Sequence, residues 1–281
     1  MKAGKVNELP SFVASLNLVK QPAMDFSYSP LNIRSESLIM DYFLVPWDAR
    51  ILGYPVAEIN HLEVIDARGA GDQFSIFMNW CDSQKIQFCN CRIRHDQLSE
   101  SFFLQQHNFR FVELNYSPEL RVLDQLELPG NSIVIEPAKA EDQELLAQMA
   151  GRIFKHGRFH QDPALGSEVG NERYKVWLLN SFSYPGQSIF KCMDNDEIVG
   201  FFVVEYPGES RCHWSLIGLA PGLGGRGMGA RVWQAMMRFH QDEGMKSIVT
   251  SISSHNTAVF NLFVKLGFRF PLPKVTFHWR P

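Results

Sequence analysis

A glycine-rich segment in the second half of the chain carries the strongest chemical signal. The segment LAPGLGGRGMGARVW, residues 219–233, places five glycines between an apolar run and the start of an amphipathic helix. Glycine lets the backbone approach a ligand closely, and successive amides at a helix N-terminus can hold phosphate oxygens. Arg226 adds a positive charge within the same loop. The segment therefore predicts a binding site for a pyrophosphate-bearing ligand.

Two other nucleotide-binding patterns compete for this loop. Gly222, Gly224 and Gly227 have the G-x-G-x-x-G spacing of dinucleotide-binding domains, but that fingerprint belongs in the first βαβ unit, with an acid near the end of the second strand. Here the loop follows an antiparallel hairpin, and the next strand ends in Ser253 and Ser254. No Lys-Ser or Lys-Thr follows the loop, which excludes a P-loop. A glycine-rich turn without a ligand remains the structural alternative, although adjacent glycines cost backbone entropy.

The elements that must position this loop are readable after residue 132. Pro129 and Gly130 interrupt the regular secondary-structure pattern there, which predicts a first domain at residues 1–130 and a second at 131–281. An antiparallel run followed by a βαβ unit predicts a mixed α/β fold with a largely antiparallel sheet. The expected strands are 133–135, 188–193, 197–205, 211–220, 246–252 and 274–279. The expected helices are an amphipathic segment around 145–153, then 171–179, 230–244 and 256–267.

The first half is less regular in pattern. Strands are expected at 72–80 and 109–116, and a helix at 97–106. The stretch FFLQQHNFRFVE is similar to the later LFVKLGFRFPL, with FRF at 109–111 and again at 268–270. Either an internal duplication, whose first copy lacks the glycine-rich loop, or a chance likeness of two helix-to-strand junctions explains this similarity.

The loop and the helix downstream resemble two motifs of the GNAT superfamily of N-acyltransferases. Residues 224–229, GGRGMG, resemble motif A, whose pattern is Q/R-x-x-G-x-G/A, and NTAVFNLFVKLGF resembles motif B. The resemblance implies a GNAT fold, with a degenerate GNAT-like first domain, and acyl-coenzyme A as the acyl donor. It assigns the pyrophosphate to the backbone of Gly224, Gly225, Arg226, Gly227, Met228 and Gly229. It assigns the pantetheine arm to the strand at Ile217 and Leu219 and to Asn256, which could instead cap the following helix.

Shorter matches extend the resemblance to the bacterial dTDP-fucosamine N-acetyltransferase branch. They are RIFKHGRFHQDP, ERYKVWLLNS and PWDARILG. They imply transfer of an acetyl or larger acyl group, such as hydroxybutyryl, to the amine of a nucleotide-linked amino sugar destined for a cell-surface polysaccharide. Another small-molecule or protein amine, or a non-catalytic acyl-coenzyme A sensor, remains the alternative.

The sequence departs from the family pattern at two positions. Gly224 stands where motif A usually opens with Gln or Arg, which removes a side chain and keeps the amide. Phe263 stands where many members place a Tyr that protonates the departing thiolate. Phenylalanine cannot donate a proton, so a water, a neighbouring group or unassisted departure of the thiolate must replace it; a thiol of pKa about 8.5 is a tolerable leaving group.

The remaining candidates are a general base and groups that hold the acceptor. Attack of an amine on a thioester benefits from a base, and Glu205 and His213 are the candidates, with a surface carboxylate and a packed histidine as the structural alternatives. A water relay is a third option. For the acceptor, the candidates are Arg158 with a diphosphate, His160 beside it, and Trp47 and Trp177 with a base or sugar. A surface salt bridge and core packing are their alternatives.

The composition excludes several other classes. The 281 residues carry a net charge of −3 without a basic stripe, so nucleic acid is not an expected partner. No stretch has the length of a membrane span, and the N-terminus lacks the apolar core of a signal peptide. The five cysteines form no paired CxxC spacing, so no metal is expected, and free thiols suggest the reducing cytoplasm. The oligomeric state is open, with a homodimer as one option.

Overall fold

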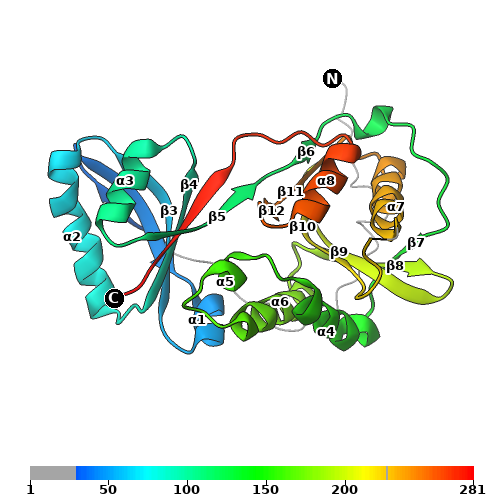
Figure 1. The fold of residues 1–281 in the computed structure, drawn as a ribbon, viewed down its shortest axis with the longest axis horizontal. Coiled ribbons are helices and arrows are strands. Elements are labelled where there is room, and N and C mark those ends of the chain that lie inside the picture. Colours follow the sequence, from blue (N-terminus) through cyan, green and yellow to red (C-terminus); the bar gives the residue numbers. More distant parts are fainter. Residues whose placement is uncertain (1–29, 226) are drawn as a thin grey trace, which may run out of the picture.

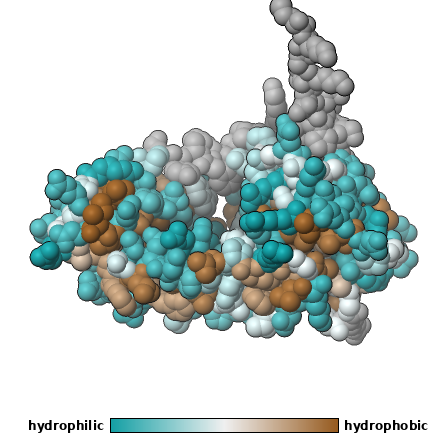
Figure 2. All heavy atoms as spheres, turned by 90° about the horizontal axis from the view of Figure 1, so that it is seen from above, coloured by the Kyte–Doolittle hydropathy of each residue, from teal (hydrophilic) through white to brown (hydrophobic). Residues whose placement is uncertain are grey.

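Two sheets, one in each half of the molecule, organise the protein. The computed structural model describes residues 30–225 and 227–281. Its halves lie side by side along the longest axis, as the ribbon and the view from above agree (Figures 1 and 2). The chain contains both strands and helices, and most strand pairs are antiparallel, so the predicted mixed α/β architecture is confirmed.

The first sheet has the strand order β1-β2-β3-β4-β13-β5-β12 within the described residues, and only β3 and β4 pair in parallel. Its strands are β1 (Leu31–Arg34), β2 (Leu38–Leu44), β3 (Val56–Val64), β4 (Phe88–Arg94), β5 (Arg110–Tyr116), β12 (Ile252–Ser253) and β13 (Lys274–Trp279). The helices of this half are α1 (Pro46–Leu52), α2 (Ala67–Ser83) and α3 (Leu98–Gln106). In β4, Cys89, Cys91 and Ile93 face the core under α2 and α3, which leaves Asn90 and Arg92 on the opposite face.

The predicted strand at 72–80 is wrong, because these residues lie inside α2. The buried positions of this helix are Ala70, Phe74, Phe77 and Cys81, whose spacing is helical, while Ile76 between them is 51% exposed. The aromatic and apolar content of the segment favoured a strand, but its burial follows the 3.6-residue period. The predictions of a helix at 97–106 and a strand at 109–116 are confirmed by α3 and β5.

The second sheet has the order β6-β11-β10-β9-β8-β7 within the described residues, and only β10 and β11 pair in parallel. Its strands are β6 (Glu119–Leu120), β7 (Val134–Pro137), β8 (Ser188–Asp194), β9 (Glu197–Gly208), β10 (Arg211–Leu219) and β11 (Ser247–Thr250). The helices are α4 (Gln143–Ile153), α5 (Arg158–Gln161), α6 (Ser167–Ser181), α7 (Met228–Asp242) and α8 (Thr257–Lys265), with short 3-10 turns at Leu123–Gln125 and Ala140–Asp142. All the elements expected after residue 132 are present, except that the expected strand at 246–252 is divided into β11 of the second sheet and β12 of the first.

The two halves exchange strands. The C-terminal strand β13 crosses to the first half and inserts between β4 and β5, where Figure 1 shows it in red among strands from the start of the chain. In return, the chain after β5 enters the second half, where β6 pairs with β11 and Glu119 bridges to Arg269. The division at residue 130 stays a prediction, and the sheets share segments across it. Within the described part of the chain, no helix is long and apolar enough to cross a membrane.

Candidate active site

A cavity of about 320 Å³ lies between the halves, where β10 and β11 separate. The two strands pair in parallel only from Arg211–Ser247 to Trp214–Thr250, and the Thr250 hydroxyl donates to the Trp214 carbonyl at 2.8 Å where the pairing ends. Beyond this point β10 continues along β9, whereas β12 turns away to pair with β5 of the other sheet. The divergence leaves an opening whose walls come from both halves.

A bulge in β10 lies at the start of this opening. Trp214 pairs with Val204 and Leu216 with Val203, so Ser215 is the extra residue, and its hydroxyl donates to the Val203 carbonyl at 3.1 Å. Ser215, Leu216 and Ile217 all line the cavity. Within the described residues, β10 beyond Trp214 has a strand partner on one side only. Its other edge therefore offers backbone groups to an extended ligand, as expected for Ile217.

Glu205 and His213, the two predicted base candidates, form a hydrogen-bonded pair in the cavity wall. They are cross-strand neighbours on β9 and β10, with His213 Nδ1 3.3 Å from Glu205 Oε2. Gln187 donates to the other carboxylate oxygen at 2.7 Å. Burial opposes ionisation of Glu205, but the hydrogen bonds from His213 and Gln187 outweigh it and lower the pKa of the carboxyl group. An ionised Glu205 that accepts from Nδ1 leaves Nε2 of His213 as the basic nitrogen.

The glycine-rich loop joins the end of β10 to the start of α7. Gly222, Gly225 and Gly227 have φ values of 82°, 78° and 75°, which explains glycine at these positions. Gly224 has no such φ, and a Cβ there would meet no described atom within 4 Å. Neither backbone conformation nor crowding among the described residues requires glycine at 224, so close approach of a ligand to this residue stays a prediction. Binding of the coenzyme A pyrophosphate by this loop stays a prediction.

The other residues predicted to hold coenzyme A lie at different positions around the place where β10 and β11 separate. Gly229 in the first turn of α7 lies where a Cβ would touch Leu262 of α8 at 3.5 Å, and Met228 packs on the core. Leu219 also packs on the core, at the end of β10. Arg226 lies outside the described residues.

Asn256 and Phe263 line the cavity from α8. The Asn256 side chain accepts from the Val259 amide at 3.3 Å, so its capping alternative is observed, and contact with a ligand stays a prediction. Phe263 is 1% exposed and packs against Phe268, with ring centroids 4.7 Å apart. The position that carries Tyr in many relatives is therefore an apolar part of the wall.

Comparison with known proteins identifies this architecture. Residues 158–268 match the model of the Acetyltransferase (GNAT) family. This region of the chain has the GNAT fold. The fold of the chain is similar to that of a GCN5-related N-acetyltransferase from Sphaerobacter thermophilus, with a TM-score of 0.61 and 13% identity over 88% of this chain and 82% of that chain. No curated protein sequence matches the chain.

Two further solved structures have a similar fold. The match to a tandem GNAT protein from the clavulanic acid biosynthesis pathway covers 90% of this chain and 83% of that chain, with a TM-score of 0.61 and 13% identity. The match to a glucosamine N-acetyltransferase region in a fungal multi-domain beta-N-acetylglucosaminidase covers 86% of this chain and 31% of that chain, with a TM-score of 0.60 and 11% identity. The family-model match and these similar folds support an acyl-CoA-dependent N-acyltransferase of the GNAT type.

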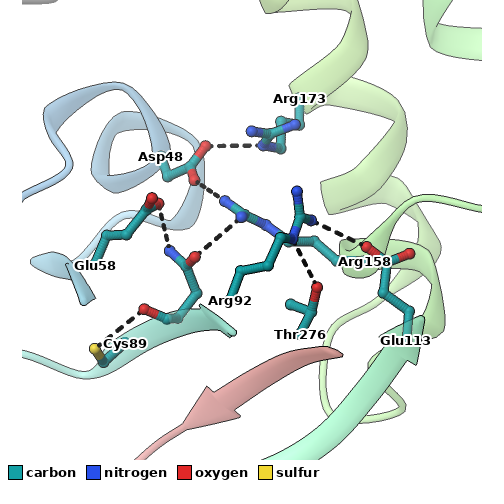
Figure 3. A network of polar contacts seen from close by, with 9 residues as sticks. Asp48, Glu58, Cys89, Arg92, Glu113, Arg158, Arg173 and Thr276 are labelled. Carbon is teal, nitrogen blue, oxygen red and sulfur yellow. Dashed lines mark hydrogen bonds and ion pairs between the residues drawn. The ribbon is translucent and has the colours of Figure 1, made fainter. Parts of the chain in front are cut away.

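Two residues predicted to hold the acceptor lie in α5 of the GNAT domain. Arg158 lines the cavity, but its side chain is only 12% exposed because it donates to Asp48 of α1 at 2.9 Å and to Asn90 at 3.0 Å (Figure 3). The ion pair of Arg158 with Asp48 is buried, whereas the alternative interpretation was a salt bridge at the surface. His160 lies outside the lining, hydrogen-bonds to Asn171 at 3.1 Å and stacks on Tyr174.

Trp47 and Trp177 line a second cavity, of about 250 Å³, between α1 and α6. Trp177 and Arg173 belong to the linings of both cavities, so the two spaces adjoin along α6. Gln187 connects them further, because it lines the second cavity and donates to Glu205 in the wall of the first. The GNAT domain and the first half together therefore form a two-part space.

Sequence analysis did not identify several residues that line the main cavity. Arg92, Glu113 and Asn115 come from the first half, yet they line the main cavity, as does Tyr174 of α6. The alternation of FCNCRIR in β4 was the available signal, since it separates a buried cysteine face from a polar face. All five cysteines are free and buried, and burial raises the pKa of Cys81 and Cys212 to about 12. No group of metal-binding side chains occurs among the described residues.

Proposed function

We propose that the protein transfers an acyl group from acyl-coenzyme A to the amine of a nucleotide-linked amino sugar. The observation that carries this proposal is the pair of adjoining cavities. The first contains the His213–Glu205 pair and opens where β10 and β11 separate, and the second is walled by Trp47 and Trp177. A bipartite acceptor, with a sugar in the first and an aromatic base in the second, fits this arrangement.

The chemistry follows from the groups in the wall. His213 Nε2 accepts a proton from the attacking amine, and Glu205 stabilises the imidazolium that forms. The amine nitrogen bonds to the thioester carbon, and backbone amides at the bulge around Ser215 are the candidates to stabilise the oxyanion. The C–S bond then breaks and coenzyme A leaves as its thiolate, without a proton from Phe263. The proton on His213 returns to solvent.

Two comparisons and the chain's chemistry support the choice of acceptor. One protein of similar fold is described as a glucosamine N-acetyltransferase region, and glucosamine is an amino sugar. The resemblance of PWDARILG, RIFKHGRFHQDP and ERYKVWLLNS to the dTDP-amino-sugar branch concerns α1, α5 and α6, and these elements line the two cavities. A cytoplasmic location, where nucleotide sugars are made, agrees with five unpaired cysteines.

The decisive experiment is a thiol-release assay with several acyl-coenzyme A donors and a panel of amines. The panel contains nucleotide-linked amino sugars, the corresponding free amino sugars, a polyamine and a peptide amine. We expect saturable turnover with nucleotide-linked amino sugars and a lower kcat/KM with the others. Turnover confined to the polyamine or the peptide would refute the sugar acceptor. Binding of acyl-coenzyme A without turnover on any amine would refute the enzyme proposal and favour a sensor.

A further inference from the structure

The first half of the chain supplies a charged wall to the main cavity. Arg92 of β4 and Glu113 and Asn115 of β5 lie on the polar face of the first sheet, opposite α5 and α6. Strand β13 runs between β4 and β5 and contributes Thr276 to the same face. The strand exchange therefore places these side chains beside the second half's catalytic candidates.

Arg92 is the arginine of this wall that is best placed to meet a ligand. Its Nε donates to the Thr276 hydroxyl at 3.0 Å and its Nη2 to Glu113 at 3.2 Å, which fixes the guanidinium (Figure 3). Among the described residues, its Nη1 has no hydrogen-bond partner, and 32% of the side chain is exposed. By contrast, Arg158 and Arg173 are 12% and 19% exposed, and both are bound to Asp48.

The surrounding charges favour an anion at this place. Of the described residues that line the cavity, the basic ones are Arg92, Lys155, Arg158 and Arg173, and the acidic ones are Glu113 and Glu205. Asp48, behind the wall, offsets part of the charge of Arg158 and Arg173. Burial and the nearby charge of Arg158 lower the pKa of Arg92, although a guanidinium remains charged at neutral pH. An anion beside Arg92 would relieve this repulsion.

We infer that Arg92 binds an anionic group of the acceptor through its available Nη1 donor. This inference rests on the proposed function, under which the group is the diphosphate of the nucleotide-linked sugar. A planar guanidinium held by two side chains is suited to a phosphate or a carboxylate, because little side-chain entropy is lost on binding. Arg158, which the sequence favoured for the diphosphate, then serves to hold α5 against α1 through Asp48.

The test is the variant Arg92→Gln, with Arg94→Gln as the matched control. Arg94 lies on the same strand, is 63% exposed and pairs with Asp96 outside the cavity. We expect Arg92→Gln to raise the KM for a phosphate-bearing acceptor by about tenfold to a hundredfold, as for the loss of a charged hydrogen bond. The effect on a free amino sugar should be much smaller, and an amino sugar with a carboxylate distinguishes the two kinds of anion. Equal effects on charged and uncharged acceptors would overturn the inference.

Two further variants separate binding from folding. Glu113→Gln keeps the shape of the wall and makes it more positive, so the KM for an anionic acceptor should fall or stay the same. If Arg92 and Glu113 only stabilised the fold, both single variants would impair the enzyme alike. The double variant Arg92→Gln/Glu113→Gln leaves no unpaired charge behind, and it should keep the unfolding temperature while retaining the high KM.

A binding measurement distinguishes failure of this inference from failure of the proposed function. Inorganic pyrophosphate is titrated calorimetrically into the full-length protein with coenzyme A saturating, so that the glycine-rich loop is occupied. We expect binding to the unmodified protein and a loss of about tenfold or more in Arg92→Gln. Pyrophosphate binding that depends on Arg92, with no turnover of amino sugars, would refute only the proposed acceptor. No binding, or equal binding to both proteins, would overturn the role of Arg92.

Discussion

Asp48 is the residue whose replacement should most clearly destabilise the join between the halves. It is 1% exposed and accepts hydrogen bonds at 2.9 Å from both Arg158 of α5 and Arg173 of α6. Substitution Asp48→Asn keeps the volume but leaves two largely buried guanidinium groups without their shared counter-charge. Removing one partner of a buried ion pair costs about 3–5 kcal/mol. At roughly 2 °C per kcal/mol for a chain of this size, we expect the melting temperature to fall by roughly 6–10 °C.

The pH dependence of this effect has a definite sign. Burial opposes ionisation of Asp48, but the charges of Arg173 and Arg158 outweigh it and lower the pKa of its carboxyl group. The stabilisation is therefore present above the carboxyl's unfolded pKa of about 3.9 and is lost as pH falls through the lower folded value. The gap in unfolding free energy between the unmodified protein and Asp48→Asn should be widest near neutral pH and shrink in acid.

Thermal denaturation followed by circular dichroism measures the melting temperature, and chemical denaturation at neutral and acidic pH measures the gap in unfolding free energy. Asp96→Asn is the control, because Asp96 pairs with Arg94 at the surface, and it should leave the denaturation midpoint nearly unchanged. If Asp48→Asn shifted the midpoint no more than this control, the buried cluster would not stabilise the join. A gap that did not change with pH would contradict the ionised state of Asp48.

Three other perturbations address the candidate site and the fold. His213→Gln should lower kcat by about 10²–10⁴-fold with little change in the KM for acyl-coenzyme A, as steady-state kinetics would show. Gly224→Val should weaken acyl-coenzyme A binding by about tenfold or more in calorimetry, while Gly130→Val, where a Cβ also meets no described atom, should not. Deletion of residues 274–281 removes β13 from the middle of the first sheet and should abolish cooperative unfolding in the first half, as hydrogen exchange would report.

Contrary results for these three would be equally informative. An unchanged kcat in His213→Gln would leave a water relay as the base. Equal affinity for acyl-coenzyme A in Gly224→Val would mean that the loop does not approach the ligand closely. Normal protection of β4 and β5 amides after the deletion would show that the first sheet closes without β13.

The sequence predicted the second half well because its signals are local. Glycine punctuation, capping by Asn256 and helical periodicity depend on neighbours in the chain, and the structure has each expected element there. The 72–80 segment failed because its aromatic residues suited either period, and burial under the first sheet decided between them. Arg92 and Glu113 were missed as acceptor candidates for a different reason. Arg92 and Glu113 lie near Arg158 because of the tertiary fold. The pairing of strands that are far apart in the sequence cannot be recognised from local residue spacing.

The place of β13 in the first sheet has a consequence for how the protein is made. Translation produces β4 and β5 long before Trp279, the last residue of the strand that must lie between them. Until β13 has been synthesised, the facing edges of β4 and β5 lack the strand that lies between them, and exposed edges of this kind can pair with other chains. Synthesis of β13, rather than synthesis of the first half, is then the event that completes the wall carrying Arg92.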